Sequence, residues 1–328
     1  MTRPRLILIV FGVIAVGLYL LNASWLAMPQ GRLTILAHRG VHQTFSEVGV
    51  DDDTCTAARI DPPRHSFIEN TIPSMRAAFA AGADIVEIDV HPTTGGQFVV
   101  FHDWTLDCRT NGHGLTRDHS LAEIQALDVG YGYTADGGKT YPLRGKGLGL
   151  APSLAQVLSA FPNRRFMINI KSNDPAEGDL LLADLTAEDH KGLDRLSIYG
   201  GVRPIARLHA AEPRLATFSK DQFKTCMLGY LALGWSGHVP AACKGGVLLI
   251  PQDQAWMLWG WPNRFLSRMQ SAGAEVFIAG ELRLKPRESI LGLDEPEDLA
   301  KLPMDWRGGI STERVEIVGP TLHKSSQP

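Results

Sequence analysis

Short apolar runs alternate with helix signals along most of this chain, and this alternation restricts its fold more than any other feature. Ser120 stands three residues before Glu123, and Ser153 three before Gln156, which is the spacing of a helix capping box. The apolar runs between such signals are too short and too continuously apolar for amphipathic helices, so we interpret them as buried strands. They cover residues 33–37, 85–90, 98–102, 166–170, 196–199, 215–218, 247–250, 276–279 and 309–312.

Strands that alternate with helices predict a parallel α/β architecture. Roughly eight strands in a domain of this size fit a distorted TIM-type (β/α)8 barrel. An open, doubly wound sheet has the same local pattern and stays open as an alternative.

The N-terminus has a composition of its own. Two arginines lie within residues 1–5, and every residue from 6 to 21 is apolar or glycine. That length predicts a transmembrane helix, and the arginines favour an N-terminus that stays in the cytoplasm. We therefore assign residues 1–30 to a membrane anchor or signal segment and residues 31–328 to the barrel domain. The expected location is the inner membrane, single-pass, with the domain in the periplasm; secretion after signal cleavage is the alternative.

The net charge and the number of cysteines limit which partners and which cellular compartment are expected. The formal net charge is −3, which gives no electrostatic case for binding nucleic acid. The four cysteines form an even set, as suits an exported domain with disulfides. Cys226 and Cys243 are close in sequence and leave Cys55 and Cys108 as the other pair, but spacing alone leaves the connectivity open.

One pair of strands breaks the parallel rule. "VEIDV" and "FVVFH" are separated only by "HPTTGGQ", which is too short for a parallel crossover and predicts an antiparallel hairpin. With Gly95-Gly96 as a two-residue loop, Asp89 lies opposite His102. Glu87 shares the face of Asp89, because side chains alternate along a strand. A slip of one residue would turn His102 to the other face.

These side chains suit the cleavage of a phosphate ester. Two carboxylates on one face fit a hard cation such as Mg²⁺ or Ca²⁺. His102 is suited to acid–base work near neutral pH, and His38 follows another strand. Arg39 and Lys171 also stand at strand ends and can bind phosphate. In a barrel these strand ends converge on one face.

The order of the motifs strengthens this interpretation. "AHRG", "IENT", "GADIVEIDVHPTTGGQFVVFHDWTLDCRTNGHG" and "APSLAQVL" together resemble the glycerophosphodiester phosphodiesterase family, within the phosphatidylinositol phospholipase C-like superfamily. The resemblance implies a TIM-type barrel and metal-dependent hydrolysis of glycerophosphodiesters to glycerol 3-phosphate and an alcohol. It also implies His38 and His102 as the catalytic pair. The family's metal carboxylates fall on Glu87 and Asp89, its nearby glutamate on Glu69, and its phosphate-facing arginine on Arg39.

The chain departs from the family pattern at several places. Where the fourth strand usually ends in Glu-x-Lys, it has Asn169-Ile170-Lys171. An asparagine oxygen still suits Mg²⁺ or Ca²⁺, so we expect a weaker metal site built from Glu69, Glu87, Asp89 and Asn169. Residues 41–68 form a longer insertion that is placed to cap the pocket. Glu313 stands where an aspartate is usual.

The substrate stays open at this point. A glycerophosphodiester is the first expectation, with a pair of histidines as general acid and base; we take His38 as the base, although the sequence does not decide this. A lysophospholipase D that acts on lysophospholipids at the membrane is the alternative, since "WMLWGWP" (residues 256–262) is suited to an acyl chain. A second alternative is a catalytically silent barrel that only binds.

Overall fold

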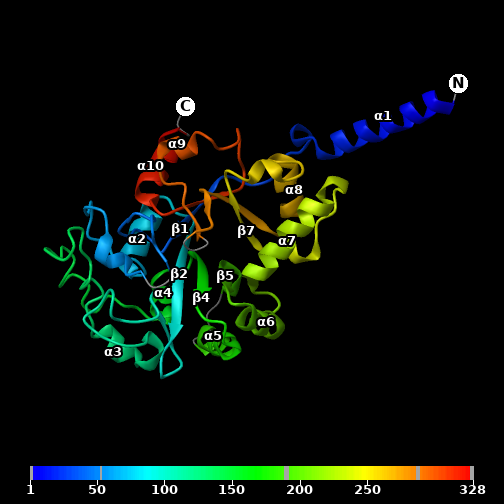
Figure 1. Cartoon of the computed structure of the whole chain (residues 1–328). Coiled ribbons are helices and arrows are strands. Elements are labelled where there is room, and N and C mark those ends of the chain that lie inside the picture. Colours follow the sequence, from blue (N-terminus) through cyan, green and yellow to red (C-terminus); the bar gives the residue numbers. More distant parts are fainter. Residues whose placement is uncertain (1–2, 52–53, 188–191, 286–288, 326–328) are drawn as a thin grey trace.

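The computed structural model describes residues 3–51, 54–187, 192–285 and 289–325, and its centre is a barrel of parallel strands (Figure 1). The strands follow one another around the barrel in the order β6-β5-β4-β2-β1-β11-β8-β7. Parallel strands that follow one another in the sequence are also neighbours in the barrel. The strand order therefore does not reverse, as it would in a doubly wound sheet. The expected TIM-type barrel is thus confirmed, with a gap in the hydrogen bonding between β6 and β7. The eight strands are β1 (Thr34–His38), β2 (Ile85–Pro92), β4 (Arg165–Ile170), β5 (Leu196–Gly200), β6 (Ala216–Ser219), β7 (Val247–Pro251), β8 (Glu275–Ala279) and β11 (Gly309–Thr312).

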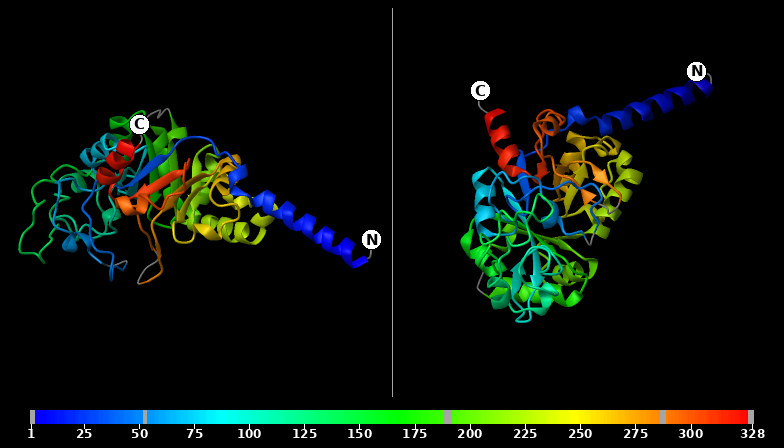
Figure 2. Two further views of the ribbon diagram at one scale, coloured as in Figure 1. Left: turned by 90° about the horizontal axis from the view of Figure 1, so that it is seen from above. Right: turned by 60° about the vertical axis from the view of Figure 1, so that its left-hand side comes forward.

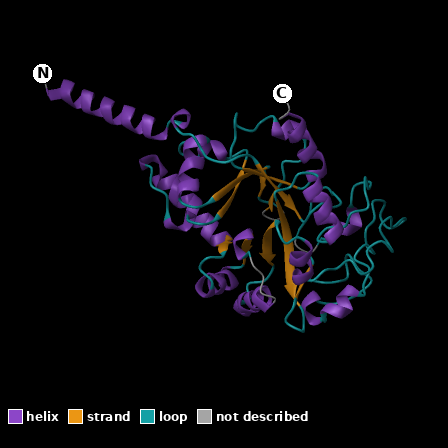
Figure 3. Ribbon diagram, turned by 180° about the vertical axis from the view of Figure 1, so that it is seen from behind, coloured by secondary structure: helices purple, strands orange, loops and turns teal. Residues whose placement is uncertain are grey.

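Helices surround the strands on the outside (Figure 3). Each expected capping signal is made. Ser120 and Ser153 accept from the backbone three residues on, and Glu123 and Gln156 reach back, so both capping boxes are confirmed. Thr71 caps the helix that precedes these two, Ile72–Ala80, by accepting from Ser74 N. The helices are α2 (Ile72–Ala80), α3 (Leu121–Gln125), α4 (Leu154–Ala160), α5 (Pro175–Ala187), α6 (Val202–Ala211), α7 (Lys220–Leu233), α8 (Asn263–Ser271), α9 (Pro296–Leu299) and α10 (Val315–Ser325).

The expected hairpin forms, but its register is one residue away from the expectation. β3 (Phe98–Val100) pairs antiparallel with β2, and Val90 lies opposite Val100. Thr93 bonds Gln97, so the loop has a third residue, Thr94, before Gly95 and Gly96. Three-residue loops with a left-handed glycine at the end are a common hairpin solution, and Gly96 has φ 78°. The prediction of Asp89 opposite His102 was therefore wrong, and Asp89 O instead accepts from Phe101 N.

α1 (Arg3–Asn22) projects away from the barrel as a single helix (Figures 1 and 2). Its last residue joins it to the barrel: Asn22 donates to Trp235 O, and Arg268 donates to Asn22 Oδ1. Across the described parts of the chain, no helix has both the length and the apolar character that a bilayer crossing requires. The expected N-terminal transmembrane helix is therefore not supported.

A second, smaller core lies beside the barrel core. It joins Ala57 and Ile60 of the 41–68 insertion to side chains of the long loop after β3, such as Leu106 and Tyr133. The Cys55–Cys108 disulfide links these two segments, and Cys226–Cys243 joins α7 to the short helix Ala241–Cys243. Both suggested cysteine pairs are thus confirmed. The remaining strands, β9 (Leu282–Arg283) and β10 (Ser289–Ile290), form a separate small hairpin.

Candidate active site

His38 is the last residue of β1 and lies at the mouth of the barrel. Its Nδ1 is 2.6 Å from Glu313 Oε2, and its Nε2 is 3.7 Å from Glu87 Oε2. Burial lowers the pKa of His38, but the charges of Glu313 and Glu87 outweigh it, so the pKa lies above its ordinary value. The backbone turns sharply two residues after His38, and this turn requires a glycine at position 40. Gly40 has φ 80°, and a side chain there would meet Ser74.

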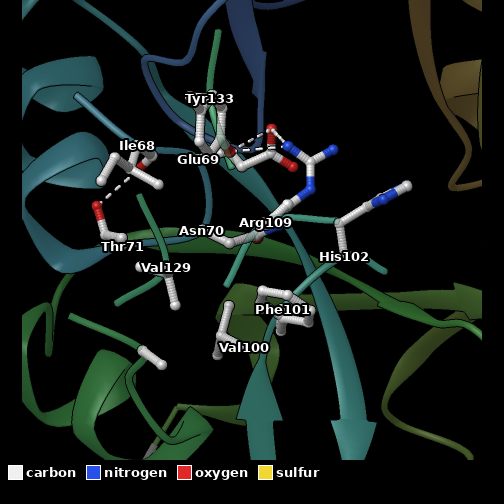
Figure 4. Close-up of a pocket in the computed structure, with 11 residues that line it drawn as sticks. Ile68, Glu69, Asn70, Thr71, Val100, Phe101, His102, Arg109, Val129 and Tyr133 are labelled. Carbon is white, nitrogen blue, oxygen red and sulfur yellow. Dashed lines mark hydrogen bonds and ion pairs between the residues drawn. The ribbon is translucent and has the colours of Figure 1, made fainter. Parts of the chain in front are cut away.

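His102 follows β3 and is held by a carboxylate in the same way. Its Nδ1 lies 2.6 Å from Asp103 Oδ1, and Arg109 Nε donates to Asp103 Oδ2 over 2.9 Å. Burial and the charge of Arg39 lower the pKa of His102 to about 4. β3 ends at Val100, so His102 does not follow the strand's alternation, and the register difference does not decide where its ring lies. His102 lines a pocket together with Glu69, Asn70 and Arg109 (Figure 4).

Glu69 lies between two arginines, and each of them binds one of its carboxylate oxygens. Arg39 Nη1 donates to its Oε1 over 3.1 Å, and Arg109 Nη1 to its Oε2 over 2.9 Å. Tyr133 completes the group by accepting from Arg109 (Figure 4). Burial works against ionisation, but Arg109 and Arg39 hold the pKa of Glu69 at about 2. Both carboxylate oxygens are therefore engaged, and a role for Glu69 as a metal ligand stays a prediction.

Asp89 gathers the phosphate-binding candidates around one carboxylate. Lys171 Nζ lies 3.3 Å from Oδ1, and Arg39 Nε lies 3.2 Å from Oδ2. Asn169 Nδ2 donates to Oδ1 over 2.9 Å, since β2 and β4 pair in the register Asp89↔Asn169. Burial opposes ionisation, but Lys171, His102 and Arg39 keep the pKa of Asp89 well below its ordinary value. Arg39 and Lys171, expected to bind phosphate, and Asn169, expected to bind the metal, thus lie around one carboxylate, and their roles stay predictions.

Glu87 makes no ion pair with a lysine or arginine among the described residues, although His38 Nε2 lies 3.7 Å from its Oε2. Tyr199 donates to its Oε1 over 2.7 Å, but its buried Oε2 has no hydrogen-bond partner among the described residues. Burial and the charge of Asp89 raise the pKa of Glu87 to about 7. A buried carboxylate oxygen without a donor is costly, and a divalent cation would satisfy it. Oxygens of Glu87, Asp89 and Asn169 lie on adjacent strands and are of the kind that Mg²⁺ or Ca²⁺ prefers. Both oxygens of Asp89 already contact Lys171, Asn169 and Arg39, so a hard-cation site here stays a prediction.

A different set of side chains is the most tightly grouped. Among the histidine, cysteine and carboxylate side chains in the described ranges, only His38, His42 and Glu313 place three ligand atoms within 4.8 Å of one another. Glu313 Oε2 faces both rings, at 2.6 Å from His38 Nδ1 and 3.0 Å from His42 Nε2.

Several of these residues were missed in the sequence. Asp103 follows His102 directly and could have been suspected from that position alone. Tyr199 stands near the carboxyl end of β5, where the strand-end rule also applies. Arg109, Tyr133 and His42 lie in irregular loops, whose paths no periodic pattern predicts.

The sequence has relatives in the curated proteins. A glycerophosphodiester phosphodiesterase of Bacillus subtilis is 35% identical over 162 residues, 45% of this chain and 53% of that protein. A second one, of Caldanaerobacter subterraneus subsp. tengcongensis, is 38% identical over 103 residues, 31% of this chain and 39% of that protein. The chain therefore matches about half or less of the length of these relatives.

Solved structures share the fold. The glycerophosphoryl diester phosphodiesterase domain of an uncharacterised Mycobacterium tuberculosis protein superimposes with a TM-score of 0.63, covering 89% of this chain and 100% of that one at 17% identity. An Oleispira antarctica phosphodiesterase, solved in complex with the product sn-glycerol-3-phosphate, gives a TM-score of 0.55 at 17% identity and covers 88% of this chain and 96% of that one. A profile of the glycerophosphoryl diester phosphodiesterase family matches residues 38–226, which carry all the candidate site residues except Glu313. Since that stretch is more than half of the chain, this protein belongs to the glycerophosphoryl diester phosphodiesterase family.

Proposed function

We propose that this protein is a divalent-cation-dependent phosphodiesterase that hydrolyses glycerophosphodiesters to glycerol 3-phosphate and an alcohol. One observation carries the proposal. His38 and His102 each have Nδ1 on a carboxylate, Glu313 and Asp103, while Nε2 is left for proton transfer. A base and an acid held in this way are what an in-line displacement at phosphorus needs.

The charged side chains divide the work around the phosphate. Arg39 and Lys171 bind the phosphate oxygens of the substrate. To do so, each gives up part of its contact with Asp89. Glu87, Asp89 and Asn169 would hold the divalent cation. When bound, Mg²⁺ or Ca²⁺ offsets the negative charge that builds up on the phosphate oxygens.

The two histidines differ in their charge surroundings, and this favours a division of roles opposite to the one taken from the sequence. His102 has its pKa lowered to about 4 and is a neutral imidazole near pH 7, which suits the base. It removes a proton from the nucleophile, a water or a neighbouring glycerol hydroxyl. His38 has a raised pKa and suits the acid that protonates the leaving alkoxide as its bond to phosphorus breaks.

Leaving-group dependence tests these roles. A nitrophenyl leaving group departs without a proton, whereas a choline or glycerol alkoxide needs one. We expect His38→Ala to lose about 10²–10⁴-fold in turnover on glycerophosphocholine but much less on a nitrophenyl phosphodiester. His102→Ala should lose activity on both substrates. Near-wild-type turnover of both variants on glycerophosphocholine would overturn the two-histidine mechanism.

A second candidate substrate is a lysophospholipid, cleaved as by a lysophospholipase D. Trp256 is 77% exposed and Trp259 is 42% exposed, which are large apolar side chains left open to a lipid. Hydrolysis of glycerophosphocholine and lysophosphatidylcholine, each with Mg²⁺, with Ca²⁺ and with EDTA, separates the candidates. Cleavage of the acylated substrate alone favours the lysophospholipid, and no hydrolysis under any cation favours a barrel that only binds.

We also propose that the domain works outside the cytoplasm. Its support is that all four cysteines are paired in disulfides, which persist in oxidising compartments. Labelling of thiols on protein taken from intact cells tests this, because free thiols in the native protein would contradict export.

A further inference from the structure

The cluster of His38, His42 and Glu313 has a hydrogen-bonding arrangement that neutral imidazoles and an ionised carboxylate do not satisfy. His42 Nδ1 lies 3.0 Å from Gln43 O, and a carbonyl oxygen only accepts, so Nδ1 carries a proton. In the neutral ring Nε2 is then an acceptor, and it faces the carboxylate oxygen Glu313 Oε2 at 3.0 Å. Two acceptors at that distance need either a second proton or a metal cation to bridge them.

The same oxygen faces a second imidazole. Glu313 Oε2 lies 2.6 Å from His38 Nδ1, and the three ligand atoms all lie within 4.8 Å of one another. The residues come from three places in the chain: the end of β1, the loop that follows it, and the residue after β11. Two imidazole nitrogens and one carboxylate oxygen are the donor set that zinc takes in many protein sites.

The surroundings match those of a metal-binding histidine. A ligating histidine usually donates its other ring N–H to a carbonyl or carboxylate, which fixes the ring, and Gln43 O does this for His42. His42 is 4% exposed, whereas His38 is 28% and Glu313 is 29% exposed on their side chains. One ligand is thus fixed in the interior, and the other two leave an approach from the barrel mouth.

We propose that His38, His42 and Glu313 bind zinc or a similar transition-metal ion, and that this ion inhibits hydrolysis. The site differs in chemistry from the oxygen-only set of Glu87, Asp89 and Asn169, so the two select different ions. An ion on His38 Nδ1 takes the place of the hydrogen bond to Glu313 that holds the ring for proton transfer. The inhibitory half of the proposal rests on the proposed role of His38 in hydrolysis.

Zinc binding is tested without reference to activity. Titration calorimetry with Zn²⁺ is run on the whole protein in excess Mg²⁺, which occupies the hard-cation site. His42→Gln keeps a donor for Glu313 but removes the imidazole, and the matched control is His113→Gln, which removes an exposed histidine that contacts Asp107. We expect wild type and the His113 variant to bind one Zn²⁺ equally and the His42 variant to bind it at least about tenfold more weakly.

Two readouts keep the test decisive. Co²⁺ in place of Zn²⁺ has visible absorption that reports its ligands, so the band of wild type should be lost or shifted in the His42 variant, and circular dichroism establishes that this variant is folded. Equal Zn²⁺ affinity in wild type and the His42 variant, or no Zn²⁺ binding by wild type, overturns the site. Binding without inhibition of glycerophosphocholine hydrolysis overturns the inhibitory role alone. Absence of any hydrolysis contradicts the proposed function, while the binding result still decides the site.

Discussion

Arg109 Nε donates to Asp103 Oδ2 over 2.9 Å, and the other oxygen of Asp103 lies 2.6 Å from His102 Nδ1. The guanidinium thus fixes the carboxylate that fixes the imidazole. Arg109 also donates to Glu69, which in turn holds Arg39. One buried side chain therefore positions both a histidine and a phosphate-binding candidate, although it is 2% exposed and lies behind the residues that meet the substrate.

Arg109→Lys tests this positioning role. Lysine keeps the charge but cannot span Asp103, Glu69, Tyr133 and Thr56, which the guanidinium bonds at once. We expect kcat on glycerophosphocholine to fall about 10–100-fold, as it does for residues that orient catalytic groups, with a smaller change in KM. The free energy of unfolding, measured in urea, should fall by about 3 kcal/mol because buried charges lose partners.

Arg144→Lys is the matched control. Arg144 is exposed and lies over the rings of Tyr131 and Tyr141 in the same long loop. Its replacement should leave kcat unchanged and lower stability by no more than about 1 kcal/mol. If kcat falls equally in both variants, any arginine-to-lysine change in this loop lowers activity, and the positioning role of Arg109 is contradicted.

Asn169 controls the hard-cation site. Its Nδ2 donates to Asp89 Oδ1, so Asn169→Asp replaces a donor by a carboxylate that repels Asp89. In EDTA the variant should have a lower Tm than wild type, and Mg²⁺ or Ca²⁺ should restore it. The cation concentration for half-maximal activity should fall about tenfold, because the site gains a negative charge.

Asn173→Asp gives the comparison for that variant. Asn173 is exposed on the loop after β4, and an aspartate there still accepts from Arg203 N. The same charge is added but away from Asp89, so neither the Tm in EDTA nor the cation requirement should change. If both variants respond alike, general surface charge explains the effect and Asn169 is not beside the cation.

Glu87 makes cation binding depend on pH. Burial and Asp89 raise its pKa from 4.5 to about 7, so without a cation the folded protein keeps a proton that the unfolded chain releases. Stability in EDTA should therefore decrease as the pH rises through this window. A cation must displace the proton, so its affinity should rise by up to about tenfold per pH unit below pH 7 and level off above it.

Glu87→Gln separates this effect from other titrations. Glutamine keeps an oxygen for the Tyr199 hydroxyl but has no charge to titrate. Calorimetric titrations with Mg²⁺ and Ca²⁺ across the pH range should show weaker binding whose pH dependence is reduced. Equal affinities in wild type and variant would remove Glu87 from the ligand set.

The strands and caps could be predicted because they depend on short-range patterns. Continuous apolar runs gave the barrel strands, and the Ser120 and Ser153 capping boxes gave the starts of α3 and α4. The hairpin register was wrong because "TTGGQ" allows both a two-residue and a three-residue loop, and sequence alone does not separate them.

The site was predictable only where its residues stand at strand ends. His38, Glu87 and Asp89 follow from that rule, and the family resemblance added Glu69. The pairing of Glu69 with Arg109 links residues far apart in sequence, and it depends on the path of two irregular loops. The contact of His42 with Glu313 depends in addition on the closure of the barrel between β1 and β11.

The Cys55–Cys108 disulfide connects stability to the active site. It joins the 41–68 insertion to the loop after β3, and its neighbours Thr56 and Arg109 are hydrogen bonded to each other. With a sequence separation of 53 residues, replacing both cysteines by serine should cost about 4 kcal/mol of unfolding free energy. It should also lower kcat, because Arg109 loses a fixed partner on the insertion.

The Cys226–Cys243 pair provides a control of the same chemical kind. It closes a shorter loop, with a separation of 17 residues, so its double serine variant should lose about 3 kcal/mol. It joins α7 to the short helix Ala241–Cys243, and none of the site contacts given above involves either cysteine. Both variants should therefore unfold at lower urea concentration, but only the Cys55/Cys108 variant should lose kcat when assayed well below its unfolding midpoint. Equal kcat in the two variants would show that the insertion does not position Arg109.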